Sequence, residues 1–452
     1  MTQKHAILGF GVTGQSVARH LLANAKECMV FDTRPSRLTP KEFEQLAIHW
    51  QIADWSKQQM ADQLGTVDRV VVSPGIELDL PILEVAREMD LPIVSDIDLF
   101  FEATTAPVIG VTGTNGKSTV VSLVGHILNR AGKTCGVGGN IGHAALDLLG
   151  RPPSCYVLEL SSFQLERSAS LPLVAASVLN VSEDHLDHHG SLQNYQQAKL
   201  RIYDKAQHRV FNRQDPVTTP NGSGRSSSFG LDAPDAENAW GVIQASRQNW
   251  IARGDEPIVA VNELPLLGNH NVLNIMAAFA LVESQVEARK AVSATAEFEP
   301  LDHRFQRVGQ LGDVIYIDDS KATNVGATLA ALQGLAPGTK VVLIGGGDAK
   351  GADLSVLRCA LSNFAVGVVA LGKDAEALLA VAHAAGVAHR HVENMTAAVA
   401  VAREMSTGAD MVLLSPACSS LDMFQNFVER GQVFAGAVRA LGAESVAGSG
   451  VS

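Results

Sequence analysis

The chain has 452 residues, which is too long for one hydrophobic core and predicts two or three domains. Hydrophobic residues make up 46% and charged residues 18%, proportions typical of a folded soluble protein. The formal net charge of −12 argues against general binding to nucleic acid or to anionic membranes. It does not exclude an anionic small substrate, because a local basic pocket decides that.

The five cysteines are scattered and form no Cys-x-x-Cys pair, so the sequence indicates neither a disulfide framework nor a zinc site. No apolar run reaches the length of a membrane span, and the first residues lack the apolar core of a signal peptide. We therefore expect a cytoplasmic protein with no membrane insertion.

The first block, residues 1–98, opens with a strand, Ala6–Leu8, followed by Gly9-Phe10-Gly11-Val12-Thr13-Gly14 and a helical pattern from Ser16 to Leu22. A second strand, Cys28–Phe31, ends at Asp32. The glycine spacing matches the dinucleotide fingerprint, with Asp32 where a ribose-binding acid would lie. Alone the signal is weak, because a compact strand–helix turn would need the same glycines.

A phosphate loop is the most informative feature of the second block. An apolar strand around Val108 and Ile109 leads into Gly110-Val111-Thr112-Gly113-Thr114-Asn115-Gly116-Lys117-Ser118-Thr119, and a helix follows over 120–128. Glycines let backbone N–H groups approach phosphate oxygens, while Lys117 can neutralise them and Ser118 can ligate Mg²⁺. The spacing departs from the strict P-loop, and the alternative is a simple tight turn.

Polar residues follow two further predicted strands of this block, Tyr156–Leu158 and Ala176–Leu179. Glu159 could hold Mg²⁺, or it could be a surface glutamate at a strand end. His185 could be a metal ligand or a proton carrier, or simply part of a solvated His-rich loop. From composition alone, Lys199 would pass for a surface lysine on a helix.

Residues 215–228 are rich in turn residues and predict a surface loop, and residues 297–303 predict a linker. A third α/β block follows, with strands at Val314–Ile317, Val341–Ile344 and Met411–Leu414. Polar residues come after each strand, and the segment from Ser415 to Leu421 predicts the start of a helix whose N-terminus would favour a carboxylate. We expect the small, polar tail after Gly442 to be mobile.

These motifs together resemble those of the Mur ligases, the ATP-dependent enzymes that add amino acids to peptidoglycan precursors. The family's form of the phosphate loop fits Thr112–Thr119 and explains the departure from the strict pattern. The match extends over nearly the whole chain except the tail and residues 215–260. It includes Gly138–Gly142, Glu159–Leu165, Asn180–Asp187, Ala198–Tyr203, Gly268–Asn271, His303–Gln306, Asp319–Asn324 and Leu414–Asp422.

The resemblance implies an α/β protein of three domains. The first, residues 1–98, would be Rossmann-like and bind the uridine diphosphate end of the substrate, without NAD. The second, residues 99–302, would be a P-loop-type ATPase domain with a mainly parallel sheet that binds ATP and Mg²⁺. The third, residues 303–452, would be Rossmann-like and bind the amino acid and part of the ATP.

The implied reaction phosphorylates a carboxylate with ATP and then forms an amide from the acyl phosphate. The last two matching segments point to D-glutamate as the incoming amino acid and UDP-N-acetylmuramoyl-L-alanine as the other substrate. Positioning and charge neutralisation should dominate such a reaction. Two Mg²⁺ ions are implied, one of them held by His185 and by Lys199 carboxylated with CO₂. The family expectation for the assembly is a monomer.

The resemblance carries residue roles onto matching positions. Catalytic roles fall on Lys117, Glu159, His185, Lys199 and Lys321, and metal ligation on Ser118, Glu159, His185 and Lys199. ATP is expected at Gly113, Thr114, Asn115, Gly116, Lys117, Ser118, Thr119, Asn271, Asn274, Arg304 and Asp319. The UDP-substrate is expected at Gly11, Val12, Thr13, Gly14, Asp32, Thr33, Arg34, Ser73, Gly75 and Asn140, and D-glutamate at Thr323, Lys350, Ser420, Leu421 and Phe427.

Three alternatives remain at the level of sequence. One is an NAD-dependent oxidoreductase that uses the Gly9–Gly14 fingerprint, which leaves the Gly116-Lys117-Ser118 loop unexplained. Another is a nucleotide-binding module without catalysis. The third is a different ligase of the superfamily that contains Mur ligases and folylpolyglutamate synthetase.

Overall fold

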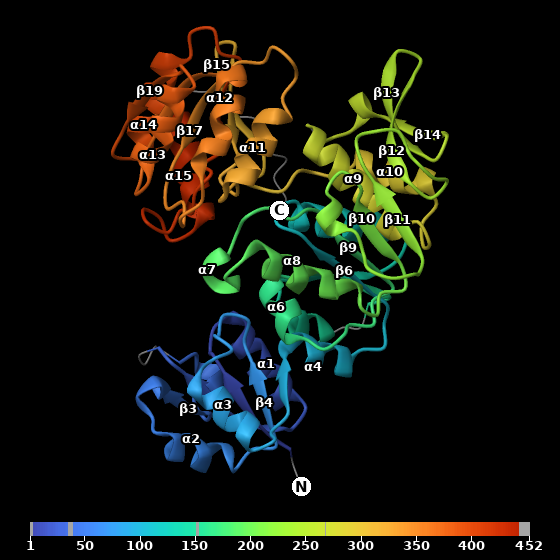
Figure 1. Ribbon diagram of the computed structural model, residues 1–452, viewed down its shortest axis with the longest axis vertical. Helices are drawn as coiled ribbons and strands as arrows, with labels where there is room; N and C mark the ends of the chain where they lie inside the picture. Colours follow the sequence, from blue (N-terminus) through green and yellow to red (C-terminus); the bar gives the residue numbers. More distant parts are fainter. Residues whose placement is uncertain (1–2, 35–38, 151–152, 267, 443–452) are drawn as a thin grey trace.

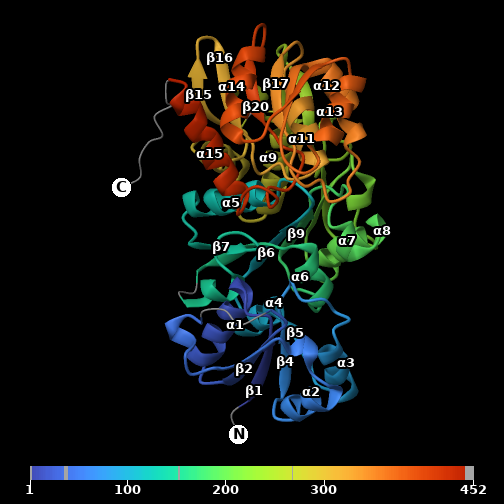
Figure 2. The same cartoon turned by 90° about the vertical axis from the view of Figure 1, so that its left-hand side faces the viewer.

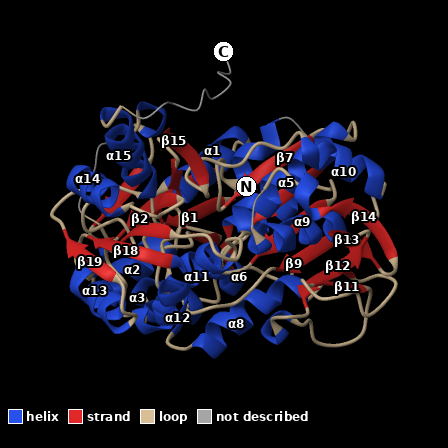
Figure 3. Ribbon diagram, turned by 90° about the horizontal axis from the view of Figure 1, so that it is seen from above, coloured by secondary structure: helices blue, strands red, loops and turns tan. Residues whose placement is uncertain are grey.

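The structure is a computed structural model that describes residues 3–34, 39–150, 153–266 and 268–442. Three α/β units are each built on their own sheet; the first lies at one end of the long axis, and the third lies beside part of the central unit towards the other end (Figures 1 and 2). Seen from above, helices lie on both sides of the strands (Figure 3). The predicted fold class, α/β with three domains, is confirmed. The exact boundaries at residues 98 and 302 stay predictions, and the predicted mobile tail after Gly442 lies outside the described residues.

The first sheet contains five parallel strands in the order β3-β2-β1-β4-β5. Its strands are buried apolar runs such as Val70–Val72, as expected for a parallel sheet covered on both faces. The strands are β1 (Lys4–Leu8), β2 (Glu27–Asp32), β3 (Ala47–Trp50), β4 (Arg69–Val72) and β5 (Ile93–Ser95), and the helices are α1 (Val12–Ala23), α2 (Lys57–Leu64) and α3 (Pro81–Glu88).

The strand order changes direction at β1, which has β2 on one side and β4 on the other. In open α/β sheets the crevice at such a switch point is where ligands bind. The glycine-rich turn between β1 and α1 lies at this crevice.

The second sheet has nine strands in the order β14-β13-β12-β11-β10-β9-β6-β8-β7, and only β12, β13 and β14 pair antiparallel. The strands are β6 (Val108–Thr112), β7 (Cys135–Gly139), β8 (Cys155–Glu159), β9 (Ala175–Val178), β10 (Arg209–Asn212), β11 (Ser226–Phe229), β12 (Trp240–Ala245), β13 (Gln248–Arg253) and β14 (Glu256–Ala260). The helices are α4 (Asp96–Ala103), α5 (Lys117–Arg130), α6 (Ser162–Arg167), α7 (Leu186–His189), α8 (Leu192–Leu200), α9 (Asn269–Val282) and α10 (Ala288–Ala296).

The phosphate loop lies at the carboxyl end of β6, which pairs with β8 on one side and β9 on the other. The residues that follow all three strands therefore meet at one edge of the sheet. Helix α5 carries the loop into the core, where it packs against α9 and buries Val120, Val124 and Ile127 completely.

The third sheet has six strands in the order β15-β16-β20-β17-β18-β19, with only β15 antiparallel to its neighbour. The strands are β15 (Gln306–Leu311), β16 (Val314–Asp318), β17 (Val341–Gly345), β18 (Ala365–Ala370), β19 (Ala388–His391) and β20 (Met411–Leu414). The helices are α11 (Val325–Gln333), α12 (Arg358–Phe364), α13 (Ala375–Ala384), α14 (Met395–Met405) and α15 (Phe427–Ala440).

Three local predictions need correction. Helix α1 begins at Val12 rather than at Ser16, so that Gly14 lies within its first turn. The predicted surface loop over 215–228 runs into strand β11 at Ser226, and Thr218 within it is fully buried. No helix starts directly after Leu421: the next helix, α15, begins at Phe427 with Asn426 as its cap. Serine and glycine runs predict loops, but here parallel pairing with β10 extends Ser226–Phe229.

Within the described ranges, no helix is long and apolar enough to cross a membrane.

Two glycines of the β1–α1 turn give a matched test of its packing. A Cβ at Gly14 would lie 1.9 Å from the carbonyl oxygen of Gly9, whereas a Cβ at Gly11 would meet nothing within 4 Å. We expect Gly14→Ala to lower the free energy of unfolding of the first domain by about 2–3 kcal/mol, because backbone must move. We expect Gly11→Ala to cost about 1 kcal/mol or less, the scale of a weakened N-cap, since φ at Gly11 is −78° and the added Cβ meets no atom. Calorimetry of both variants checks this, and equal losses would contradict it.

Candidate active site

The phosphate loop turns sharply between β6 and α5 by using two glycines with positive φ. Gly113 has φ 149° and Gly116 has φ 85°. A Cβ at Gly116 would lie 2.4 Å from Oδ1 of Asn274 on α9. Glycine is thus required both by the backbone conformation and by the close approach of α9.

The side chain of Lys117 folds back over this loop. Its Nζ donates to the carbonyl oxygens of Gly113, at 2.9 Å, and Thr114, at 2.8 Å. Burial lowers the pKa of Lys117, while the negative charges of Glu159 and Asp184 oppose that shift. The loop therefore holds a partly buried amine at the N-terminus of α5, where an anion would be stabilised.

Ser118, Glu159 and Asn140 form the group of oxygen and amide atoms beside the loop. Ser118 Oγ donates to Glu159 Oε2 at 2.6 Å, and Asn140 Nδ2 donates to Glu159 Oε1 at 2.8 Å. Glu159 is 3% exposed, which excludes the reading as a surface glutamate. Burial alone would raise its pKa, but Lys117, Ser118 and Asn140 together hold that pKa below its ordinary value.

Lys199 is not the surface lysine that composition suggested. It lies on α8, is 1% exposed, and its Nζ donates to the same Gly113 oxygen at 2.8 Å. The ring of Tyr195 lies 4.4 Å from Nζ, and the Tyr195 hydroxyl is 3.2 Å from Thr114 Oγ1. Burial and then the charge of Lys117 lower the pKa of Lys199 well below its ordinary value, which favours the neutral amine.

His185 lies between this group and the third domain. It caps α7 with φ 54°, and its ring packs against Phe163 at 5.0 Å between centroids. Burial lowers its pKa; Asp184 opposes the shift, and the charges of Lys350, Lys117 and Lys199 add to it. Lys350, from the third domain, is thus electrostatically close to His185.

A cavity of about 400 Å³ separates the central and third domains next to the phosphate loop. It brings together residues from the two domains that the sequence assigned to one nucleotide. These are Asn115, Gly116, Thr119, Asn271, Asn274, Arg304 and Asp319, with Lys321 beside them.

Charged groups of the third domain face the loop across this cavity. Burial raises the pKa of Asp319 to about 7, although Ser415 Oγ donates to its Oδ2 at 2.8 Å. Burial, and then the charge of Arg304, lowers the pKa of Lys321 to about 8. Asn324 Nδ2 donates to Asn115 Oδ1 at 3.2 Å, so that the two domains touch at the loop itself.

The residues predicted for the UDP-substrate mostly surround the crevice of the first domain. The carboxylate of Asp32 is already occupied there, because it accepts from Phe10 N at 2.7 Å and from Arg34 Nε at 2.8 Å. Ser73 Oγ donates to Gly9 O at 3.1 Å. Gly11, Val12, Thr13 and Gly14 form the cap and first turn of α1, while Thr33, Arg34 and Gly75 follow β2 and β4. Asn140 lies apart from them, beside Glu159 in the central domain.

The five residues predicted for D-glutamate come from three segments of the third domain. The Phe427 ring lies 3.8 Å from Lys321 Nζ, and Lys321 in turn lines the nucleotide cavity near Thr323 in sequence. Ser420 is buried, whereas Leu421 is 71% exposed. Lys350 is exposed and has φ 53°, held by a hydrogen bond from its N–H to Asp348.

Sequence reasoning did not single out Tyr195 or the partnership of Asn180 with Asn115. The spacing of Tyr195 and Lys199 by four residues on one helix face was the available signal for the first. Asn180 Oδ1 accepts from Asn115 N at 2.8 Å, a contact between distant strand ends that no local pattern indicates.

Comparison with known proteins decides the family. The model of the Mur ligase MurD-like N-terminal domain matches residues 3–95, that of the Mur ligase middle domain residues 111–282, and that of the Mur ligase glutamate ligase domain residues 303–418. The chain belongs to the Mur ligase family. Membership removes the reading of Gly9–Gly14 as the mark of an oxidoreductase and confirms the predicted family.

Two curated relatives cover almost the whole chain. The UDP-N-acetylmuramoylalanine--D-glutamate ligase of Shewanella violacea is 40% identical over 99% of this chain and 98% of its own length. The protein of the same name from Aliivibrio salmonicida is 42% identical over 95% of each.

Among solved structures, Mur ligases from Thermotoga maritima share the fold. The UDP-N-acetylmuramate-alanine ligase MurC has a TM-score of 0.62 at 20% identity and covers 98% of this chain and 100% of its own. The MurF ligase in complex with ADP has a TM-score of 0.59 at 15% identity and covers 98% and 96%.

The pair of His303 and Asp318 beside Arg304 gives a test by pH. His303 Nδ1 lies 2.7 Å from Asp318 Oδ2, and this hydrogen bond raises the pKa of His303. The stabilisation by protonated His303 is complete below its unfolded pKa of about 6.5 and is lost as the pH rises through the higher folded value. Between pH 6 and 9 the free energy of unfolding of the wild type should therefore fall by roughly 1–3 kcal/mol relative to that of His303→Asn.

Asparagine suits this position because His303 has φ 61°, which Asn tolerates. The control is His391→Asn on the exposed strand β19. The free energy of unfolding of this variant should follow that of the wild type at every pH. Parallel profiles for wild type and His303→Asn, measured by chemical denaturation, would contradict the expectation.

Proposed function

We propose that the chain is an ATP-dependent ligase that joins D-glutamate to UDP-N-acetylmuramoyl-L-alanine with release of ADP and phosphate. The observation that carries this proposal is the meeting of Lys117, Glu159 and Lys199 beside a cavity that the third domain completes. The names of relatives at 40% identity over the full length support the choice of substrates. Such an enzyme works on cytoplasmic precursors, and we propose a monomer.

The first step would transfer the γ-phosphoryl group of ATP to the substrate carboxylate. The amine of D-glutamate would then attack the acyl phosphate, and the tetrahedral intermediate would collapse to the amide and phosphate. Such chemistry depends on positioning and on stabilising developing negative charge. Lys117 is already held at the loop where the outer phosphates would lie, and Lys321 and Arg304 supply positive charge from the opposite wall.

The donor set fits hard divalent cations. Ser118 Oγ and the Glu159 carboxylate are adjacent oxygen ligands of the kind that Mg²⁺ prefers, and His185 lies in the same region. Ser118 and Glu159 would hold Mg²⁺, which would supply positive charge beside the phosphate groups.

Lys199 would become a ligand through carbamylation. Only a neutral amine attacks CO₂, with loss of a proton, and burial lowers the pKa of Lys199 in the direction that favours the neutral amine. The product is an anionic oxygen donor, which a hard cation accepts.

We propose ligands for the remaining residues from their positions in the three domains. Gly11, Val12, Thr13, Gly14, Asp32, Thr33, Arg34, Ser73 and Gly75 would bind the uridine diphosphate, and Asn140 the muramoyl-peptide end. Thr323, Lys350, Ser420, Leu421 and Phe427 would surround D-glutamate, with Lys350 pairing with a carboxylate. The remaining loop positions, Gly113 to Thr119, and Asn271, Asn274, Arg304 and Asp319 would hold ATP.

Phosphate release tests the proposal. The full chain receives ATP, Mg²⁺ and UDP-N-acetylmuramoyl-L-alanine, and then D-glutamate, L-glutamate, L-lysine or L-alanine in separate reactions. Release that requires D-glutamate is the expected result. Release with another amino acid would keep a ligase but assign it to another member of the superfamily. No release with any of them would favour a binding module and overturn the proposal.

Lys199→Ala tests the carbamate directly. We expect a loss of roughly 10²–10³ in kcat, the usual cost of removing one electrostatic group from a transition state. We also expect ¹³C-bicarbonate to give a carbamate NMR signal in the wild type that is absent from the variant. Added acetate should restore part of the activity by supplying an oxygen ligand.

The control is Lys205→Ala, which removes an exposed lysine just beyond the same helix. It should keep both the NMR signal and the activity. A carbamate signal that persists in Lys199→Ala would assign it to another lysine and contradict the expectation.

Lys350→Ala tests the D-glutamate site. Loss of one charged partner should raise KM for D-glutamate about tenfold or more, with little change in KM for ATP. Lys373→Ala is the matched control, because Lys373 belongs to the same surface but pairs with Asp348 at 3.1 Å. Equal effects of the two variants would show that the charge of the surface, rather than Lys350, matters.

A further inference from the structure

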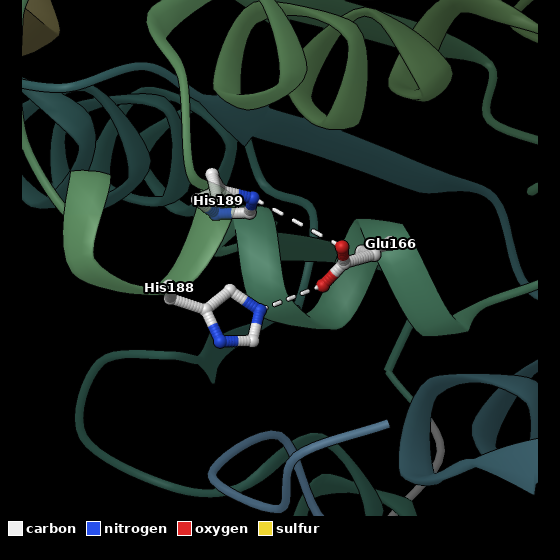
Figure 4. Close-up of side chains that lie close together, drawn as sticks. All are labelled: Glu166, His188 and His189. Carbon is white, nitrogen blue, oxygen red and sulfur yellow. Dashed lines mark hydrogen bonds and ion pairs between the residues drawn. The ribbon is translucent and has the colours of Figure 1, made fainter. Parts of the chain in front are cut away.

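Three side chains outside the proposed reaction converge on one point between α6 and α7 (Figure 4). Glu166 lies near the end of α6, and His188 and His189 form the last two residues of α7. His188 Nε2 is 2.9 Å from Glu166 Oε2, and His189 Nδ1 is 4.0 Å from Glu166 Oε1. One ligand atom from each of the three lies within 4.8 Å of the others.

This donor set is that of a transition metal rather than of magnesium. Two imidazoles and one carboxylate suit Zn²⁺, Co²⁺ or Ni²⁺, whereas Mg²⁺ prefers oxygen ligands. Tetrahedral ligands around zinc lie roughly 3.4 Å apart, since each bond is about 2.0–2.1 Å long. Small side-chain rotations of Glu166 and His188 would bring the three atoms to that spacing.

The ring of His189 is held in the orientation that such a site needs. Its side chain is 1% exposed, and its Nε2 is 3.0 Å from Ser162 Oγ. That contact leaves Nδ1 facing Glu166, too far away for a hydrogen bond. A second partner on the other ring nitrogen is the usual way in which proteins orient a metal-ligating histidine.

The surroundings support an accessible but fixed site. The ring of Phe163 packs against both histidines, with centroids 4.5 Å from His188 and 5.5 Å from His189. Side-chain exposures of 20% for His188 and 32% for Glu166 leave a path for the ion and for a water ligand. Arg167 Nη1, 3.5 Å from Glu166, opposes a cation, but it also donates to Phe163 O at 2.7 Å and so is directed partly away.

The geometry points to a site for Zn²⁺ or a similar transition-metal ion at Glu166, His188 and His189, separate from the Ser118–Glu159 pair. A bound ion would tie α6 to α7. Because α7 starts directly after His185, this would fix the segment that presents His185 to the central domain. The inference does not depend on the identity of the ligase substrates.

Binding of the metal alone tests the inference. The full, tag-free chain is stripped of metal and titrated with Zn²⁺ against a chromophoric chelator, with millimolar Mg²⁺ present to occupy oxygen sites. We expect one Zn²⁺ per chain, a rise in the melting temperature, and with Co²⁺ the visible absorption of a four-coordinate ion. Glu166→Gln and His188→Ala should each weaken binding at least tenfold, the usual scale for loss of a site's supporting groups. His189 is left intact because its removal would open a cavity.

Two controls separate this site from others. His391→Ala removes an exposed histidine of β19, and Cys135→Ser removes a thiol whose strand neighbour is Cys155. Both should bind Zn²⁺ as the wild type does. The inference is overturned if the wild type binds no Zn²⁺, if Glu166→Gln and His188→Ala bind it unchanged, or if Cys135→Ser abolishes binding.

Discussion

The carbonyl oxygen of Gly113 is the point on which the site depends, because two lysines share it, Lys117 partly buried and Lys199 fully buried. Lys117 Nζ donates to it at 2.9 Å and Lys199 Nζ at 2.8 Å. Two ammonium groups so close would repel each other in a low dielectric, and burial penalises both charges. Burial and the charge of Arg304 lower the pKa of Lys117, whereas burial and then the charge of Lys117 lower the pKa of Lys199 well below its ordinary value. The two amines therefore share one backbone oxygen but differ in their surroundings, as their proposed roles with phosphate and with CO₂ would require.

Several contacts around the phosphate loop hold the two lysines in this arrangement. Gly113 can receive both lysines only because β6 ends between β8 and β9, with Glu159 at one strand end and Asn180 near the other. The Asn180 amide holds the loop backbone from both directions, since it accepts from Asn115 N and donates to Asn115 O at 3.0 Å. Asn115 then meets Asn324 of the third domain. The loop that is proposed to bind phosphate is therefore also a place where the central and third domains touch.

The sequence predicted the parts of this structure that local patterns control. Continuous apolar runs such as Val341–Ile344 predicted buried parallel strands, and the glycine-lysine-serine turn predicted the loop. Strand β19 (Ala388–His391) was not predicted, because all four residues are exposed and only its backbone pairing with β18 makes it a strand. The burial of Lys199 was not predicted for a related reason: Gly113, whose carbonyl oxygen accepts from its Nζ, lies 86 residues away in the chain. The role expected for Lys199 came from the resemblance to the Mur ligases, because the spacing of residues along the chain did not indicate it.

The net charge of −12 does not set the charge of the cavity, where cationic and acidic side chains lie together. Arg304 and Lys321 line the cavity with Asp215 and Asp319, and burial raises the pKa of Asp319 to about 7. A carboxyl group with that pKa is partly protonated at neutral pH, so Asp319 offsets the two cations only in part. Burial lowers the pKa of Lys321 to about 8 and also that of Lys117, because the charged amines lose contact with solvent. An anionic ligand would relieve that loss by supplying a counter-charge at short range. Because the relief acts over a few ångströms inside a low dielectric, it can outweigh the long-range repulsion of an acidic surface that salt screens beyond about 8 Å.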